Sequence, residues 1–461
     1  MLRLLALLLL LLAGCQRFHP QPLAADKSAA ELEQRSLEDH GLQIFLQKNL
    51  NRQLPQWPIK TWDLEMLTWA GLYYHPDLAV ARAQLAVAQG GELTAAQRPN
   101  PTLNVTPTYN VTTTVPSPWD PLGSLDVPIE TAGKRRHRRA QAQHLSEAAR
   151  FNIISVAWQV RSKVRTSLFD LIAAQRRAEV LQKQLGLQEE IVRRTEQELQ
   201  AGAVGSAELL PLRITLAKAR LDLADAARQQ AEPRSGLAEA MGVPLRALAG
   251  LEFKYVSSQN TAPVELTSAE ARKQALTSRT DILESLAQYA ASQSALQLEI
   301  AKQYPDIHLQ PGYEFDQGDS KWSLGLTVDL PILNQNQGPI AEAKARRQEA
   351  AAKFNALQAK VLAEIDRAVE ILNVNQTNQA SLRALSEAQA RRHESVSAQF
   401  KAGAVDQLEV LNADLEAANA AALELDGQIK FEQAVGALED AIQRPFPLPP
   451  SLFQSTELEK H

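Results

Sequence analysis

The stretch Ile307–Leu330, IHLQPGYEFDQGDSKWSLGLTVDL, decides the fold. Apolar and polar residues alternate through most of 307–316 and 322–330. Such a period of two is typical of strands that present one face to an apolar environment and the other to water. We therefore predict a β-hairpin over about 306–332, between segments that have the composition of long helices.

A second hairpin is predicted over about 102–130, in the first half of the chain. Residues 102–114 alternate in the same way, and a loop rich in Pro and Ser leads to a weaker strand around Leu125–Ile129. The chain therefore has four predicted strands. Tyr109, Tyr313 and Trp322 are the aromatic side chains expected in the girdles of an outer-membrane barrel.

The two hairpins belong to an internal tandem repeat. Pro101 and Tyr109 recur as Pro305 and Tyr313 at one constant offset, and the turn sequence AGAV occurs once in each half. Each half is predicted to contain a helix, a strand hairpin and two long helices joined by a short turn. The fold class is thus mixed α and β, mostly α.

The long helices are predicted to pack as antiparallel coiled-coil pairs. After the first turn, the apolar residues step by three and four positions, as in a coiled-coil seam: Leu209, Leu212, Leu216, Ala219, Leu223 and Ala226. Short turns at 202–205 and 403–406 require the paired helices to be antiparallel. The composition, 45% hydrophobic but only 5% aromatic, also suits closely packed rods.

These patterns divide the chain into five parts. We predict a signal peptide, an N-terminal tether, a first structural repeat, a second structural repeat and a C-terminal tail over residues 1–14, 15–60, 61–245, 246–445 and 446–461, respectively.

The N-terminus indicates export. A basic residue, an apolar run over Leu4–Leu12 and the small residues before Cys15 form a secretory signal. The sequence around Cys15 resembles the lipobox of bacterial lipoproteins, which implies that Cys15 is acylated; an ordinary signal peptide with an incidental cysteine is the alternative. No later apolar run reaches the roughly 20 residues of a membrane helix, so a membrane span would have to consist of strands.

Several function classes find no support in the sequence. The net charge of −5 does not suit a nucleic-acid partner. No catalytic, phosphate-binding or metal-ligand motif occurs, so we expect no enzyme, no cofactor and no metal site. The basic run Lys134–Arg139 is predicted to open a helix at the membrane face, near anionic headgroups or partner carboxylates.

Four strands are too few to close a barrel in lipid, where each unpaired backbone group costs several kcal/mol. The strands must therefore be pooled between chains in a cyclic oligomer. The strand pattern does not choose between two, three and four copies.

The duplicated plan resembles the TolC-type outer-membrane efflux family. The segments VDLPILNQNQGPIA at 328–341 and IETAGKR at 129–135 are similar to its heavy-metal, resistance-nodulation-division branch. The resemblance implies a homotrimer with a 12-stranded transmembrane β-barrel in the outer membrane and an α-barrel tunnel in the periplasm. It also implies docking on a periplasmic adaptor and on an inner-membrane proton-driven pump.

The same resemblance implies functional residues at the turns between the long helices. The adaptor-contact tip would comprise Gly202, Ala203, Val204, Gly205, Gly403, Ala404 and Val405. The periplasmic gate candidates are Glu409, Asp406 and Glu208. Asn412 stands where the family often has a second acid, which departs from a two-carboxylate ring.

The sequence therefore predicts a passive exit duct for heavy-metal cations expelled by the inner-membrane pump. A duct for organic compounds or secreted polypeptides is an alternative within the same class. A lipid-anchored coiled-coil scaffold that never spans the membrane is the alternative of a different class.

Overall fold

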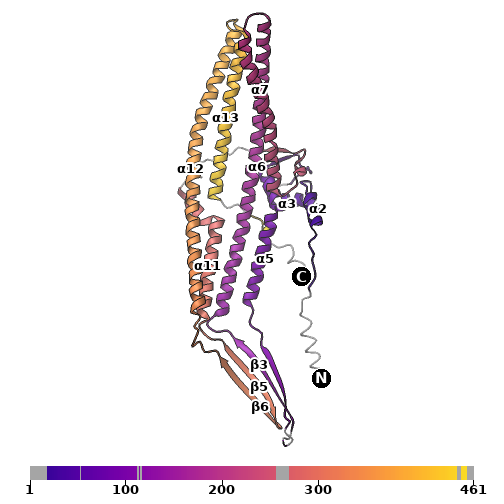
Figure 1. The fold of residues 1–461 in the computed structure, drawn as a ribbon, viewed down its shortest axis with the longest axis vertical. Helices are drawn as coiled ribbons and strands as arrows, with labels where there is room; N and C mark the ends of the chain where they lie inside the picture. The colour runs from indigo at the N-terminus through magenta and orange to yellow at the C-terminus, as the bar shows by residue number, and fades with distance from the viewer. Residues whose placement is uncertain are drawn as a thin grey trace.

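The computed structural model describes residues 18–453, without 52, 55, 112–113, 115–116, 256–268 and 444–447. Helices run along most of an elongated molecule, with strands at one end and two helix–helix turns at the other (Figure 1). Cys15 and the predicted signal segment lie outside the described residues. Among the described helices, none is both long and apolar enough to cross a membrane.

The first half contains one helix of 67 residues, about 100 Å long. In chain order, its elements are α2 (Ala25–Gln34), α3 (His40–Leu50), β1 (Thr61–Asp63), α4 (Leu64–Tyr74), α5 (Pro76–Ala96), β2 (Thr102–Tyr109), β3 (Trp119–Ile129), α6 (Lys134–Gln200), α7 (Ser206–Gln229) and α8 (Ala231–Met241).

The second half contains a helix of 65 residues. Its elements are η1 (Leu245–Leu248), β4 (Glu252–Lys254), α10 (Ala269–Ser278), α11 (Thr280–Ala301), β5 (Ile307–Asp316), β6 (Asp319–Val328), α12 (Gln337–Lys401), α13 (Gln407–Ile442) and η3 (Pro450–Phe453). Near the strands, α6 lies between α5 and α11, and α12 follows on the far side of α11 (Figure 1).

The four long strands form one antiparallel sheet in the order β2-β3-β5-β6, which leaves β2 and β6 at its edges. The predicted strand over 102–114 ends earlier, at Tyr109, and its partner begins earlier, at Trp119. These two residues oppose each other, with ring centroids 5.0 Å apart. Pro121 and Gly123 obscured this part of β3 in the sequence, because both residue types disfavour strands.

The register separates apolar from polar side chains across most of the sheet, with Leu122 as an exception on the polar face. One face carries Leu103, Val105, Tyr109, Trp119, Leu125, Val127, Ile129, Ile307, Leu309, Tyr313, Phe315, Trp322, Leu324, Leu326 and Val328. On this apolar face Trp322 is 82% exposed and Leu324 72% exposed. The same registry brings the ring centroids of Tyr313 and Trp322 to 4.9 Å. The opposite, polar face carries nearly all of the strands' charged side chains.

A hydrophobic core packs against one side of α6 about midway along the molecule. Trp62 and Leu67 are fully buried there together with Val160 of α6. The helices approach so closely that a Cβ atom on Gly71 would lie 3.0 Å from Val160 Cγ1. Leu42 of α3 is also fully buried in this core, so part of the segment expected to be a tether is packed into the body.

A second core joins the helices of the second half. Its buried members come from α10, α11, α12 and α13, including Ile282, Val361 and Leu438. A third, smaller cluster holds α7 against α6 through Leu209 and Leu216 of the predicted coiled-coil seam. Apolar burial at helical spacing thus holds each long helix to its neighbour.

The two halves are tied together by an ionic cluster between α6 and α13. The Arg165 side chain is 7% exposed, and it contacts Glu439 at 2.9 Å and Asp440 at 2.6 Å. Ser162 Oγ also donates to Asp440, at 2.7 Å. Gly436 leaves room for the guanidinium, because a Cβ atom there would lie 2.9 Å from Arg165 Cζ.

We expect Arg165→Ala to destabilise the protein by about 2 to 3 kcal/mol, because the partly buried Asp440 loses its ion pair and Glu439 keeps only Arg161, at 3.9 Å. Arg177→Ala is the matched control, since it removes an ion pair with Asp426 in which both side chains are more than 40% exposed. Thermal unfolding in detergent measures both variants. Equal midpoints for the two variants would contradict this assignment.

Candidate functional site

Two helix–helix turns form the end of the molecule opposite the sheet. In the first, Gly202 has φ +75° and Ala203 N–H donates to the Glu198 carbonyl at 2.8 Å. In the second, Gly403 has φ +75° and Ala404 N–H donates to the Gln399 carbonyl at 2.9 Å. Both are Schellman turns, which require a residue that tolerates the left-handed region.

The helices that follow these turns are capped by acidic side chains. The Asp406 carboxylate accepts the Glu409 backbone N–H at 2.8 Å and so caps α13. The Glu208 carboxylate accepts the Gly205 backbone N–H at 3.4 Å at the start of α7. Two of the three predicted gate residues therefore have a local structural role.

Glu409 differs from these two residues. It is exposed in the first turn of α13, and its carboxylate makes no hydrogen bond or ion pair within the described part of the chain. Some other carboxylates toward the tips are paired: Arg213 contacts Glu196 at 2.6 Å, and Arg220 contacts Glu189 at 2.9 Å. Glu409 is thus a carboxylate whose negative charge is not offset by an ion pair.

Glu190, about three turns before the end of α6, shows how strongly this pairing acts. It accepts hydrogen bonds from Arg193 and Arg194, which lower the pKa of its carboxyl group to about 2. A carboxyl group with its pKa lowered in this way stays charged well into the acid range.

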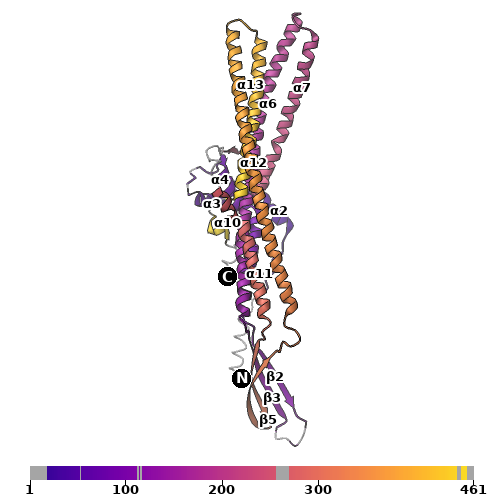
Figure 2. The ribbon, with the colours of Figure 1, turned by 90° about the vertical axis from the view of Figure 1, so that its left-hand side faces the viewer.

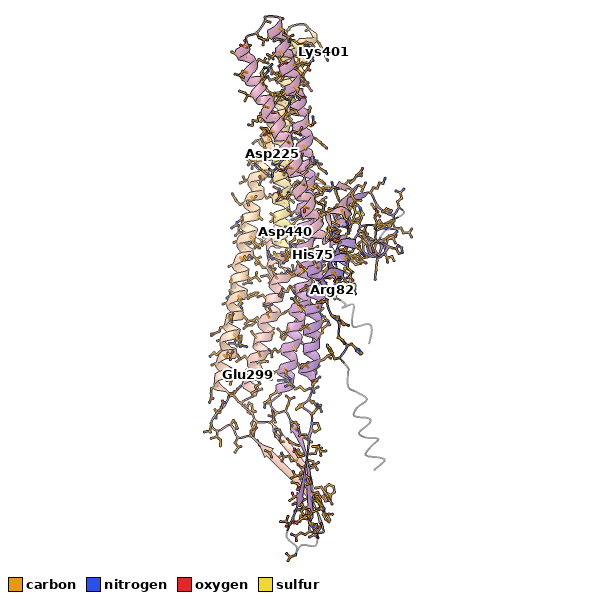
Figure 3. The ribbon with its side chains drawn as sticks, turned by 45° about the vertical axis from the view of Figure 1, so that its right-hand side comes forward. His75, Arg82, Asp225, Glu299, Lys401 and Asp440 are labelled. Carbon is orange, nitrogen blue, oxygen red and sulfur yellow. The ribbon has the colours of Figure 1, made fainter. Side chains whose placement is uncertain are left out.

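The two helix pairs separate toward their turns (Figure 2). Figure 3 places Lys401, the last residue of α12, at this end of the molecule. Closer to the middle, Gln184 of α6 donates to the Asn419 side chain of α13 at 2.9 Å. The polar cross-connections between the two arms that the structure describes therefore lie away from the turns.

The polar face of the sheet is strongly acidic. It carries five carboxylates, Asp120, Asp126, Glu314, Asp316 and Asp319, against one lysine and one histidine, Lys321 and His308. Lys321 pairs with Asp316 at 2.5 Å, and His308 Nδ1 lies 3.0 Å from Asp126 Oδ1. These residues were not among the functional residues predicted from the sequence, although the alternation that predicted the strands also assigns them to one face.

Within the described residues, no three His, Cys, Asp or Glu side chains come together as a metal site. The features that remain are a two-faced sheet, a long helical body and two turns with acidic helix starts.

A family model for outer membrane efflux proteins matches residues 72–243. The sheet and the long helix pairs are the architecture that the sequence predicted from its resemblance to the same family. The matched residues are those of an outer membrane efflux protein, of the TolC family. The family predicted from the sequence is confirmed, and it is a family of non-enzymatic outer-membrane efflux channels.

Known members show how far the likeness to this efflux protein extends. The cobalt-zinc-cadmium resistance protein CzcC of Cupriavidus metallidurans is 23% identical over 340 residues, covering 73% of this chain and 79% of CzcC. A crystal structure of CusC matches with a TM-score of 0.66 and 18% identity, over 82% of this chain and 91% of CusC. The outer-membrane channel OprN matches with a TM-score of 0.65 and 19% identity, over 93% of this chain and 98% of OprN.

In this efflux protein, we expect Asp406→Ala to loosen the first turn of α13, because the loss of an N-cap costs about 1 kcal/mol. Asp406→Asn keeps a capping oxygen and removes only the charge. Hydrogen exchange of the amides of residues 407–411 should accelerate about fivefold in the alanine variant and remain near wild type in the asparagine variant. Unchanged exchange in Asp406→Ala would show that the cap is dispensable.

Proposed function

We propose that three copies of this chain form the exit duct of a tripartite efflux pump. The main support for this proposal is the sheet. It has four antiparallel strands, an exposed apolar face and two open edges. Such a sheet suits a barrel wall, with the apolar face toward lipid and the polar face toward a water-filled lumen.

The open edges support pooling of strands between copies. In a hydrocarbon environment, the unpaired N–H and C=O groups of β2 and β6 would each cost several kcal/mol. Pairing of β6 in one copy with β2 in the next removes both edges. Three copies give the 12-stranded barrel that the resemblance to the family implied.

The helical body would continue this barrel as a tunnel in the periplasm. The two halves, 61–245 and 246–445, would each supply one strand hairpin and one helix-pair arm. The turn residues, Gly202–Gly205 and Gly403–Val405, would contact a periplasmic adaptor, which in turn joins an inner-membrane resistance-nodulation-division pump.

Glu409 is the strongest of the three gate candidates. An unpaired carboxylate from each copy would form a ring that narrows the tunnel entrance and favours cations. Asp406 and Glu208 would add negative charge while they cap α13 and α7. We propose one acid per copy in this ring, Glu409, because Asn412 stands at the position where the family often has a second acid.

Heavy-metal cations are the proposed cargo. The name of the related CzcC protein refers to resistance to cobalt, zinc and cadmium. The excess of carboxylates on the polar face of the sheet agrees with a cationic cargo, because lining charges of one sign favour ions of the other. Transport of organic compounds or polypeptides would not need this bias, and a scaffold that never enters the membrane would not need the apolar face.

We also propose that acylated Cys15 anchors the protein in the outer membrane beside its barrel. The motif around Cys15 supports this placement, and the first described helices lie beside the helical body rather than beneath its tips (Figure 1).

Light scattering on unboiled, detergent-extracted protein tests the oligomer. We expect a mass of three chains of 50.7 kDa each, less the signal peptide and plus any acyl chains. Extraction by salt without detergent, or a monomer in mild detergent, would contradict the channel and favour the scaffold.

Conductance in planar bilayers tests the polar face. Glu314→Gln removes one charge per chain from this face, so we expect the cation-to-anion permeability ratio to fall by about a factor of two. Glu65→Gln, at an exposed position of α4 at the side of the body, removes the same charge and should change nothing. An equal response of both variants would mean that the polar face does not line the pore.

A further inference from the structure

Six consecutive residues, Lys134–Arg139, begin α6 at the end that adjoins the sheet, and five of them are Lys or Arg. Three of these cations already have partners. Lys134 contacts Asp306 at 2.8 Å, Arg135 Nε donates to the Ala96 carbonyl at 2.7 Å, and Arg138 contacts Glu130 at 2.7 Å. These interactions fasten α6 to the end of α5 and to the base of the sheet.

Arg136 and Arg139 are different. Both side chains are exposed, and neither makes a hydrogen bond or ion pair with any described residue. Arg135 and Arg138 contact the end of α5, and His137 Nδ1 lies 3.2 Å from Gln297 Oε1 of α11. Arg136 and Arg139 therefore occupy the part of the helix surface that faces neither neighbour.

The hydrophobic core farther along α6, toward the turns, shows which way this surface faces. At 3.6 residues per turn, Arg139 lies about 20° from the direction of Val164 and about 60° from that of Val160, and Arg136 lies about 60° further round on the same side. Val160 and Val164 pack against α4, since a Cβ atom on Gly71 would lie 3.0 Å from Val160 Cγ1 and 3.4 Å from Val164 Cγ2, and α4 belongs to the bulge at the side of the body (Figure 2). Arg136 and Arg139 thus lie on the outer surface, on the same side as the bulge.

The position of Arg136 and Arg139 along the long axis of the molecule is also defined. β3 ends at Ile129, on the apolar face, and α6 begins five residues later at Lys134. A strand of ten residues spans about 33 Å, close to the thickness of a bilayer's hydrocarbon core. The first two turns of α6 therefore lie at the level of the lipid headgroups when the apolar face is in the membrane.

We propose that Arg136 and Arg139 bind the phosphate groups of anionic phospholipids in the periplasmic leaflet of the outer membrane. This site rests on the proposed membrane placement of the sheet. Guanidinium groups bind phosphate oxygens through paired N–H donors. The equivalent start of α12 has the sequence QGPIAEA, without a basic residue, so each copy would supply one such site.

A lipid headgroup fits this position better than an acidic protein. The two arginines border an exposed apolar face, where lipid is the neighbouring material once the sheet is inserted. Such juxtamembrane cations attract anionic lipid by about fivefold per side chain, and the effect weakens as salt screens the charges.

Native mass spectrometry of the full-length protein in mixed micelles tests the site. The probes are phosphatidylglycerol and phosphatidylcholine at equal mole fractions. We expect the wild type to retain phosphatidylglycerol in preference by about tenfold or more. The double variant Arg136→Gln/Arg139→Gln should lose most of this preference, and 0.5 M salt should weaken it in the wild type.

Arg150→Gln is the matched control. Arg150 lies on the same surface of α6, is exposed, has no described partner, and stands 11 residues or about 17 Å beyond Arg139. It should therefore keep the wild-type preference. Equal lipid selection by the double variant and the wild type, or none in the wild type, would overturn the site.

The oligomeric state and detergent dependence of the same protein show whether only the lipid site fails or the proposed membrane channel fails as well. A detergent-dependent trimer without lipid preference removes only the headgroup site. A protein that stays dispersed without detergent removes the membrane placement as well.

Discussion

Hydrogen bonding at the edges of one small sheet is the constraint on which the structure depends. β2 and β6 each have a neighbour on one side only, and the apolar side chains next to them are exposed. A sheet with these properties is unstable as an isolated unit in either water or lipid. In the proposed trimer, pairing between copies would satisfy the edges, and it would explain why one chain supplies only four strands.

The helical body holds the sheet in a form that permits such pairing. α5, α6, α11 and α12 lead directly into or out of the four strands, so the order of the helices follows the order of the sheet. The apolar cores pack against α6 and α12 midway along these helices, and the ion pairs of Arg165 link the two halves. Toward the turns, the arms separate, which leaves that end of the molecule the freest to change shape.

The two ends of the molecule place negative charge in different ways. At the tips, several carboxylates are neutralised by arginine or used as caps, whereas Glu409 at the start of α13 has neither an ion pair nor a capping role within the described residues. On the sheet, the carboxylates outnumber their partners along a whole face. A duct for cations would benefit from both, because entry and exit would favour the same sign of charge.

The sequence by itself determined the long helices, the antiparallel strands and the family. Local patterns carry that information: the period of two in 307–316, the steps of three and four after Leu209, and the glycines that the turns at 202 and 403 require. The sequence was less accurate for β3, whose outer part contains Pro121 and Gly123 and forms only because β2 and β5 pair with it.

Only the tertiary structure decided the rest. It assigned Leu42 to the core rather than to a tether, because burial depends on what α4 brings alongside. It gave Asp406 a capping role and left Glu409 unpaired, a difference that depends on backbone geometry at the turn. It also separated Arg136 and Arg139 from their neighbours in the basic run, because the helix phase is fixed by contacts with α5, α11 and α4.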